Sequence, residues 1–448
     1  MTLTLKTTPG NPLRGEITLP GDKSISHRAI LLASLADGKS IVGNLLVAGV
    51  TQTMLNALNQ LGVDWTLKNT ELVVVAHGLN GLQSPAMPIN CGNSAATMRL
   101  LVGALAAAGA SAVLDGSTGL RRRPMSRIVD PLWKMGVAVR ALGDNGTAPL
   151  QIAPRFGDRL LRTLTHHSPI ASAQVKTCLL LAALAADGDV TIHEPAPSRD
   201  HTERLLASMG ADIERVEHPN GTVQITLHPQ PEVELRPLQF TIPGDISSAA
   251  FLIVATLITP GSKITIREVG LNPTRTGLLD ALKQMGADIN IQPHGERHGE
   301  PVGDIDVSYS KLRGVEVANP LAVRMIDEFP IFAVAAAYAQ GETIVRNCEE
   351  LRHKETDRIA GICAELQTLG VNITEAPDGF AIQGGTPLTG GETNPHGDHR
   401  LAMALAVAGL NAQSSVNVQD AGIISESFPT FFEVLHDLGA NVSIHNGQ

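Results

Sequence analysis

The chain has 448 residues, enough for more than one domain and for sizeable hydrophobic cores. Its formal net charge of -10 argues against general binding to nucleic acids or membrane surfaces, so an anionic ligand would need a local group of Lys and Arg. Four cysteines without CxxC or zinc-site spacing, no signal-peptide pattern and no apolar run of about 18 residues predict a soluble, cytoplasmic protein with reduced thiols.

The first predicted element is a helix that begins within residues 20–38, PGDKSISHRAILLASLADG. Lys23, Ser24, His27 and Arg28 lie at its start, just before an apolar run. A helix N-terminus already carries free N–H groups and the positive end of the dipole, so cations there are unfavourable in isolation. The stretch therefore predicts a helix start that binds an anion.

From there the chain repeats one pattern, a helix end with glycine followed by a short strand. Each copy predicts a glycine in the left-handed cap conformation and then a β-branched strand. The glycines are separated by 74, 74, 76, 84 and 69 residues: Gly62, Gly136, Gly210, Gly286, Gly370 and Gly439.

A second pattern precedes each glycine, a polar or charged start followed by an Ala/Leu-rich stretch of one helix length. Examples are CGNSAATMRLLVGALAAAG, ASAQVKTCLLLAALAADG, GDISSAAFLIVATLITPG, IDEFPIFAVAAAYAQG and GDHRLAMALAVAGLNAQ. Each unit of roughly 75 residues thus holds two helices and several strands. PGDKS at residue 20 and PGDISS at residue 243 are the closest pair, which predicts two halves of three units, with boundaries near 20 and 240.

The polar residues at these helix starts predict a ligand site rather than a purely structural repeat array. Capping explains the Ser, Asp and Asn members. It does not explain the cations Lys23, Arg28, Lys176 and Arg400, which need an anion between them. The full sets are Lys23/Ser24/Arg28, Asn93/Arg99, Ser172/Gln174/Lys176, Asp245/Ser247/Ser248, Asp327/Glu328 and Asp398/His399/Arg400.

Two further charged stretches leave alternatives open. Residues 119–127, GLRRRPMSR, form either a solvated charge run or a phosphate clamp with at least one Arg directed inward. Residues 350–358, ELRHKETDR, form either a surface helix with i,i+3 and i,i+4 ion pairs or a face on which Glu355 and Arg358 lie beside a ligand.

Several common catalytic patterns are absent from the sequence. There is no Walker A motif, no GxGxxG that opens a βαβ unit, no HExxH and no GxSxG elbow. The histidines are scattered, so we expect neither a metal site nor a cofactor. The chemistry that remains is acid–base and electrostatic catalysis by Lys, Asp, Glu, His and Arg on a polyanion.

A set of motifs, in order and from about residue 10 to 440, resembles the 5-enolpyruvylshikimate-3-phosphate synthase family. The motifs are GDKSISHRA, GNSAATMR, RRPMSR, SAQVK, IDEFP, RHKETDR, GDHRLAM and SFPTFFE. SAQVK at 172–176, RDHTE at 199–203 and NPTR at 272–275 resemble the class II branch of that family.

The resemblance implies an α/β fold, a two-domain inside-out α/β barrel of six βαβαββ repeats, three in each domain, with buried helices and ligands in the cleft. It also implies a continuous domain at about 21–240, on the shikimate 3-phosphate side. A discontinuous domain of residues 1–20 and 241–448 would lie on the phosphoenolpyruvate side.

The implied reaction transfers the enolpyruvyl group of phosphoenolpyruvate to the 5-hydroxyl of shikimate 3-phosphate and releases phosphate, in the shikimate pathway to aromatic amino acids. Both substrates are polyanions. By resemblance, shikimate 3-phosphate binds Lys23, Ser24, Arg28, Ser172, Ala173, Gln174, Arg199, Asp327 and Lys354. Phosphoenolpyruvate binds Lys23, Asn93, Ala95, Arg123, Gln174, Arg358 and Arg400.

The resemblance also assigns the proton transfers. Asp327 would take the proton of the 5-hydroxyl, and Glu355 and Lys23 would move the proton at the vinyl carbon, through a tetrahedral intermediate. A carboxylate among several cations stays ionised and can act as a base. Closure of the cleft would exclude water and align the substrates.

Two positions depart from the family pattern. Ala95 stands where glyphosate-sensitive members carry glycine, and its methyl group would crowd the phosphoenolpyruvate pocket, so we expect low sensitivity to glyphosate. Many members carry a lysine before the last FP motif, where this chain has Glu426 and Ser427, so no site residue is assigned there.

Two other functions compete with this one. An enolpyruvyl transferase for UDP-N-acetylglucosamine would have a similar fold, but it uses a cysteine in a mobile, charged loop and a lysine–asparagine pair in the first helix, where this chain has Lys23 and Ser24. An inactive anion-binding scaffold would not need Asp327, Glu355 and Lys23 together. The family is mostly monomeric, so we expect a monomer without nucleic-acid or membrane partners.

Overall fold

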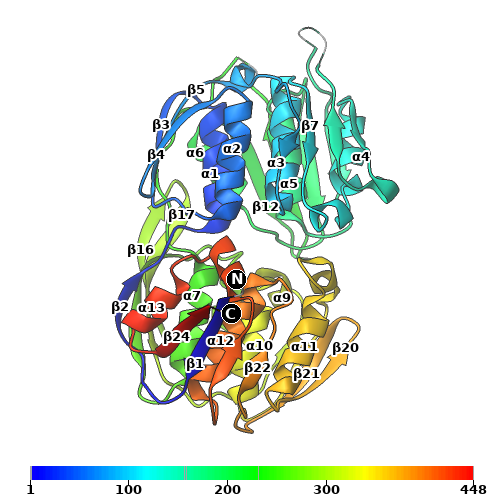
Figure 1. Cartoon of the computed structure of the whole chain (residues 1–448). Helices are drawn as coiled ribbons and strands as arrows, with labels where there is room; N and C mark the ends of the chain where they lie inside the picture. The colour runs from blue at the N-terminus through cyan, green and yellow to red at the C-terminus, as the bar shows by residue number, and fades with distance from the viewer. Residues whose placement is uncertain (1–2, 156, 158, 231, 447–448) are drawn as a thin grey trace. The chain divides into compact units, whose positions relative to one another are not determined.

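The computed structural model describes residues 3–155, 157, 159–230 and 232–446, which divide into two compact units (Figure 1). The central unit comprises Gly21–Ile242 and Arg297–Glu300. The terminal unit comprises Met1–Pro20, Pro243–Glu296 and Pro301–Gln448. The short segment Arg297–Glu300, at the tip of a hairpin whose strands continue in the terminal unit, belongs by its contacts to the central unit.

Within the described ranges, the central unit contains three four-stranded sheets of one design. In each, an edge strand pairs in parallel with its neighbour, and the other two pairings are antiparallel. The first sheet has the order β14 (Gln239–Thr241), β3 (Asp37–Gly43), β5 (Glu71–His77), β4 (Asp64–Lys68). The second is β6 (Ile89–Asn90), β7 (Ala112–Asp115), β9 (Leu150–Ile152), β8 (Val139–Ala141). The third is β10 (Leu164–His167), β11 (Val190–Glu194), β13 (Val223–His228), β12 (Asp212–Glu217).

The described part of the terminal unit repeats this design, with two sheets completed by strands from the beginning of the chain. One sheet has the order β16 (Asp288–Arg297), β17 (Glu300–Ser308), β15 (Lys263–Gly270), β2 (Arg14–Thr18). Another is β22 (Gly391–Thr393), β23 (Val416–Val418), β1 (Leu3–Thr8), β24 (Asn441–Asn446). The remaining sheet is β18 (Glu316–Val317), β19 (Gly341–Val345), β21 (Gly379–Gly384), β20 (Asn372–Ala376).

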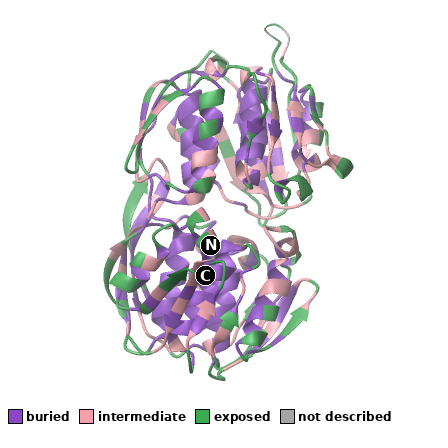
Figure 2. Cartoon of the chain, viewed as in Figure 1, coloured by how far each residue is buried: buried purple, intermediate pink, exposed green. Residues whose placement is uncertain are grey.

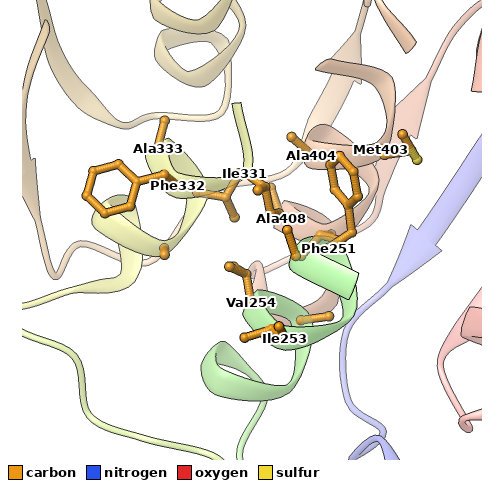
Figure 3. Packing of buried hydrophobic residues seen from close by; sticks show 14 of the residues in the cluster. Phe251, Ile253, Val254, Ile331, Phe332, Ala333, Met403, Ala404 and Ala408 are labelled. Atoms are coloured by element: carbon orange, nitrogen blue, oxygen red, sulfur yellow. The ribbon is translucent and has the colours of Figure 1, made fainter. Parts of the chain in front are cut away.

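The Ala/Leu-rich stretches form the buried helices of each unit (Figure 2). They are α1 (Lys23–Leu35), α3 (Ala95–Ala108) and α5 (Ala173–Ala183) in the central unit, and α7 (Ile246–Ile258), α10 (Phe329–Tyr338) and α12 (His399–Ala408) in the terminal unit. Every residue of α7 and of α12 is buried. In the terminal unit, Phe251 and Val254 of α7 lie beside residues of α10 and α12, including Ile331 and Ala408 (Figure 3). The predicted α/β fold with buried helices is therefore confirmed.

The second helix of each repeat ends as the sequence predicted. These helices are α2 (Gly49–Gln60), α4 (Ser126–Lys134), α6 (His201–Ser208), α8 (Gly277–Gln284), α11 (Arg358–Thr368) and α13 (Phe431–Asp437), and a short α9 (Leu321–Arg324) precedes α10. Each of the six is followed by a glycine with φ between 79° and 102°, a region that other residues rarely adopt. The left-handed glycine caps are confirmed. In the part of the chain that the structure describes, no helix has both the length and the apolar character to span a membrane.

The buried helices pack closely because small residues lie between them. Gly103 of α3 faces the backbone of α5, where a Cβ atom would lie 2.3 Å from the carbonyl oxygen of Cys178. A real Cβ cannot approach a backbone oxygen so closely, so the two helices would have to move apart. The position of α5 relative to α3 thus depends on the missing side chain of Gly103.

We expect Gly103→Ala to lower the free energy of unfolding by about 1–3 kcal/mol, because the clash outweighs the better helix propensity of alanine. Chemical denaturation monitored by circular dichroism measures this. Gly188→Ala is the control in the same unit, since its Cβ would meet only Thr163 at 3.7 Å, and we expect a change within about 0.5 kcal/mol. Equal stability of Gly103→Ala and wild type would contradict this packing.

Candidate functional site

The start of α1 gathers polar groups from three helices of the central unit. Asp22 caps the helix by accepting a hydrogen bond from the Ile25 N–H at 2.9 Å. Arg28, one turn further on and 5% exposed, donates from Nε to Thr202 Oγ1 at 2.7 Å and from Nη2 to Thr177 Oγ1 at 3.0 Å. Its Nη1 donates to the Ser24 carbonyl oxygen at 2.9 Å. The guanidinium of Arg28 is therefore held in place by hydroxyl and carbonyl oxygens of α1, α5 and α6.

Two other residues of the predicted cluster lie at the same helix start. Arg199, just before α6, donates from Nη1 to Ser24 Oγ at 3.0 Å. Lys23 is the first residue of α1 and is half-buried. His27 does not add a positive charge, because burial lowers its pKa to about 4 and its Nδ1 donates to the Lys23 carbonyl oxygen at 2.9 Å.

The start of α5 lies next to this group. Ser172 is the N-cap residue, and its Oγ accepts from the Val175 N–H at 3.5 Å. Ala173 follows at the first helical position, and its carbonyl oxygen is 3.5 Å from Nη2 of Arg28. Gln174 accepts a hydrogen bond at Oε1 from Nη1 of Arg99 at 2.6 Å. We define the central cluster as Lys23, Ser24, Arg28, Ser172, Ala173, Gln174 and Arg199.

Lys176 behaves differently from the other cations predicted at helix starts. It is 1% exposed, and its Nζ forms ion pairs at 2.8 Å with both Glu194 and Glu203. The prediction that Lys176 needs an external anion is therefore wrong, because two acidic residues of the same unit already neutralise it. They lie 18 and 27 positions further along the chain, too far apart in sequence to be recognised as partners.

The start of α3 carries the remaining predicted residues of the central unit. Ala95 is the first residue of the helix and is 2% exposed. Asn93, which is exposed, accepts at Oδ1 from Ser117 Oγ at 3.0 Å. In the arginine run 121–123, the first two side chains are exposed and Arg121 pairs with Asp115, whereas Arg123 is half-buried. Arg123 thus fits the inward-directed alternative better than its two neighbours do.

In the terminal unit, Asp327 is surrounded by three cations. Its Oδ1 lies 3.4 Å from Nη1 of Arg358 and 3.8 Å from Nζ of Lys354, and its Oδ2 lies 3.7 Å from Nη2 of Arg400. Asp327 immediately precedes Glu328, the N-cap residue of α10. Its side chain is 15% exposed, so the carboxylate can be reached from solvent.

Arg358 connects two helix starts. Its Nε donates to Asp398 Oδ2 at 2.6 Å, and Asp398 caps α12 by accepting from the Arg400 N–H at 2.8 Å. Its Nη2 pairs with Glu355 Oε2 at 2.7 Å. Burial opposes the charge of Arg358, but Asp398, Glu355 and Asp327 outweigh this cost and hold the pKa of its guanidinium above the ordinary value. Arg358 is therefore permanently charged and rigidly held.

The stretch 350–358 does not form the single surface helix that was one alternative. A 3₁₀ segment at Glu349–His353 ends before Lys354, and α11 begins at Arg358 with Asp357 as its cap. Glu355 lies in the irregular turn between them and forms an i,i+3 ion pair with Arg358, so the two side chains lie together, and a ligand beside them stays a prediction. We define the terminal cluster as Asp327, Lys354, Glu355, Arg358 and Arg400.

The surroundings stabilise the protonated form of Lys354 less than that of Arg358. Burial lowers the pKa of Lys354, and Arg358 acts in the same direction, while Asp327 and Glu355 only partly compensate. Among the three cations of the terminal cluster, only Lys354 can lose a proton, because the guanidiniums of Arg358 and Arg400 do not deprotonate.

Sequence analysis named most of the polar groups behind the terminal cluster but missed their contacts with one another. Glu328, buried, lies 3.9 Å from Nη1 of Arg400 and accepts a hydrogen bond from Ser247 Oγ. Arg275 donates to Ser247 Oγ at 2.7 Å and pairs with Asp245 at 3.3 Å. The motifs PGDISS, NPTR and IDEFP contain these residues, but nothing in their spacing showed that they meet.

One group of potential metal ligands lies elsewhere in the described terminal unit: Glu268, His294 and Asp304. Nδ1 of His294 is 2.9 Å from Glu268 Oε1, and Arg267 donates from Nη1 to Asp304 Oδ2 at 2.5 Å. The guanidinium of Arg267 already supplies the positive charge that Asp304 requires. None of these residues belongs to either cluster.

Comparisons with known proteins identify the family of this chain. The family model described as EPSP synthase (3-phosphoshikimate 1-carboxyvinyltransferase) matches residues 7–435. A 3-phosphoshikimate 1-carboxyvinyltransferase of Coxiella burnetii is 45% identical over 445 residues, 99% of each chain, and one of Geobacter metallireducens is 45% identical over 432 residues, 96% of this chain and 98% of the relative. The solved EPSP synthase of Acinetobacter baumannii has a TM-score of 0.88 and 37% identity, and covers 99% of this chain and all of its own. This chain therefore belongs to the EPSP synthase family of transferases.

Proposed function

We propose that this protein transfers the enolpyruvyl group of phosphoenolpyruvate to the 5-hydroxyl of shikimate 3-phosphate, giving 5-enolpyruvylshikimate 3-phosphate and phosphate. The observation that carries the proposal is Asp327, one carboxylate faced by three cations at distances of 3.4–3.8 Å. Such a carboxylate remains ionised and can accept a proton, while the cations beside it can bind the anionic groups of a substrate.

The central cluster provides the groups proposed to bind shikimate 3-phosphate. Arg28 and Arg199 are held by hydroxyl and carbonyl oxygens in the contacts described above. Guanidiniums that are already ordered in this way can bind the phosphate of a ligand with little further loss of side-chain freedom. Lys23 and the N-terminal N–H groups of α1 and α5 add further donors for a phosphate. Residues 21–240 are accordingly proposed as the shikimate 3-phosphate domain.

Phosphoenolpyruvate is proposed to bind Arg358 and Arg400 of the terminal cluster, together with Lys23, Asn93, Ala95, Arg123 and Gln174. Residues 1–20 and 241–448 are proposed as the phosphoenolpyruvate domain. Arg358 is fixed by Asp398 and Glu355, so it can bind an anion without first losing side-chain freedom. Lys354 and Asp327 are proposed to contact shikimate 3-phosphate. Arg99 is a further residue that orients Gln174.

The proposed chemistry is acid–base catalysis at two atoms. Asp327 accepts the proton of the 5-hydroxyl group. At the same time, the oxygen of that hydroxyl forms a bond to the central carbon of phosphoenolpyruvate. Glu355 or Lys23 delivers a proton to the vinyl carbon, which gives a tetrahedral intermediate. Removal of a proton from the resulting methyl group, with loss of phosphate, then restores the double bond. The proposal involves no metal and no cofactor.

The cysteines argue against the related transferase that acts on UDP-N-acetylglucosamine. Cys91, Cys178, Cys348 and Cys363 are all buried. Burial raises the pKa of the thiols of Cys91, Cys178 and Cys363 to about 12, so they are poor nucleophiles at neutral pH. The four thiols are free rather than paired in disulfides, which fits a reducing location. We still expect a cytoplasmic, monomeric, class II-like enzyme.

The proposed reaction is tested by phosphate release from purified protein. We expect release with phosphoenolpyruvate plus shikimate 3-phosphate, and the appearance of 5-enolpyruvylshikimate 3-phosphate in the mass spectrum. Neither compound alone should give phosphate. Release with UDP-N-acetylglucosamine in place of shikimate 3-phosphate would overturn the proposal, and binding of the compounds without turnover would indicate a scaffold.

Asp327→Ala should lower kcat by about 10²–10⁴-fold, because the proposed base is lost, and change the KM of either substrate much less. Steady-state kinetics with each substrate varied in turn measures both quantities. Glu342→Gln, which alters an exposed carboxylate of the same unit, should leave kcat within about twofold of wild type. Unchanged turnover in Asp327→Ala would refute its role.

Ala95 should make the enzyme tolerant of glyphosate, because this buried residue is the first of α3, and its methyl group would crowd the proposed phosphoenolpyruvate site. We expect Ala95→Gly to lower the half-inhibitory concentration of glyphosate by about tenfold or more, consistent with the about 1–3 kcal/mol that an overpacking methyl group costs. Inhibition curves at fixed phosphoenolpyruvate measure this. Strong inhibition of the wild type at low glyphosate concentration would contradict it.

A further inference from the structure

A buried ionic triad lies behind the central cluster and contacts it through the backbone of Ser172. Lys176 of α5 pairs at 2.8 Å with Glu194, at the end of β11, and at 2.8 Å with Glu203 of α6. The side chains of Lys176 and Glu194 are 1% exposed and that of Glu203 is 5% exposed. Charges so deeply buried are costly to desolvate, and hydrophobic residues would stabilise such a place at least as well. The triad therefore needs a reason beyond stability.

One end of the triad holds the start of α5. Glu194 accepts a hydrogen bond at Oε1 from the backbone N–H of Ser172 at 3.1 Å. Its Oε2 accepts a hydrogen bond from Nζ of Lys176 at 2.8 Å. Ser198 donates its hydroxyl to the same carboxylate at 2.7 Å. Lys176 is one turn after Ser172, so the lysine orients the carboxylate that in turn fixes the N-cap residue of α5. Ser172 and the two residues after it belong to the central cluster.

The other end of the triad holds the partners of Arg28. Glu203 follows Thr202 on α6, and Lys176 precedes Thr177 on α5. Thr177 Oγ1 and Thr202 Oγ1 are 2.6 Å apart, and both accept hydrogen bonds from Arg28. The Lys176–Glu203 ion pair and the threonine pair are thus adjacent links between the same two helices. A change in the first link shifts the second, and with it the guanidinium of Arg28.

The charge balance supports this arrangement. One ammonium faces two carboxylates in a buried place. Burial raises the pKa of Glu203 above its ordinary value, and Lys176 compensates only in part. Burial also opposes the charge of Lys176, but the two glutamates together hold its pKa above the ordinary value. Lys176 is therefore charged, and its charge is neutralised by Glu194 and Glu203 rather than by a substrate.

We propose that Lys176, Glu194 and Glu203 are positioning residues that fix the Ser172 backbone and the Arg28 guanidinium for binding of shikimate 3-phosphate. This rests on the proposed function, since it assigns a role to residues behind that binding site. The triad acts through Ser172, Thr177 and Thr202 and does not touch the substrate. It determines affinity for shikimate 3-phosphate rather than for phosphoenolpyruvate.

The test measures binding and kinetics in parallel. In Lys176→Met, we expect the KM for shikimate 3-phosphate and the Kd for that compound alone, from titration calorimetry, to rise about tenfold. The KM for phosphoenolpyruvate should stay within about twofold. Ile152→Ala, which truncates a buried core residue of β9 in the same unit, is the stability control: it should lower Tm and leave both KM values within about twofold.

A pair of variants at Glu194 tests the mechanism and remains informative if Lys176→Met does not fold. Glu194→Gln retains a carbonyl oxygen for the Ser172 N–H, whereas Glu194→Met removes the acceptor. We expect the Kd for shikimate 3-phosphate to rise about tenfold in Glu194→Met and no more than about threefold in Glu194→Gln. Equal losses in the two variants would overturn the role of the Ser172 contact.

The outcomes separate this inference from the proposed function. If wild-type protein neither binds shikimate 3-phosphate nor releases phosphate, the proposed function fails. If wild type does both, but Lys176→Met and Glu194→Met lower only Tm and bind shikimate 3-phosphate as wild type does, the triad is purely structural and the inference is wrong.

Discussion

A buried helix start must satisfy both its free N–H groups and any charge that it carries. The fold places the starts of six mostly buried helices under this constraint, three in each unit. The terminal unit meets it mainly with acids: Asp245 and Asp398 cap their helices, and Glu328 lies among Arg400 and Ser247. In the central unit, Asp22 caps α1, Ser94 and Ser172 cap α3 and α5, and two threonine hydroxyls accept hydrogen bonds from Arg28.

Rigid support distinguishes the two clusters from ordinary charged surfaces. Arg358 is held by Asp398 and Glu355, and Arg28 by two threonines and the Ser24 carbonyl oxygen. A side chain that is already ordered loses little entropy when it binds a ligand. The low-dielectric surroundings also make each contact stronger than it would be in water. Positioning by buried partners is therefore as much a part of these clusters as the residues that face a ligand.

The architecture could be predicted from local sequence because each repeat marks its own helix ends. The glycines after the second helices have positive φ in the structure, since no side chain opposes that conformation at the turn. The apolar stretches that begin at Ile246 and His399 are buried over their whole length, as their composition indicates. Patterns of this kind involve neighbours in the chain, and reading them needs no knowledge of how distant segments meet.

The partners of the charged residues could not be predicted in the same way. The sequence predicted that Lys176 binds an external anion, because Glu194 and Glu203 are distant in the chain. Only the packing of β11 and α6 against α5 brings these two glutamates to Lys176. Arg358 likewise begins a helix that the charge pattern of 350–358 did not reveal, and its strongest partner, Asp398, lies 40 residues away. Long-range pairing of charges depends on the tertiary fold, and the motifs identified the residues without their contacts.

The N-terminal strand has a consequence for how the chain folds. β1 lies between β23 and β24, so Leu5 pairs with both Val418 and Ile444. Val418 and Ile444 lie 413 and 439 positions after Leu5, so this sheet can close only after the whole Gly21–Ile242 segment has been synthesised. That segment makes up nearly all of the central unit, which is compact in itself. Closing so long a loop adds an entropic cost to the assembly of the terminal unit, a cost that grows only slowly with loop length.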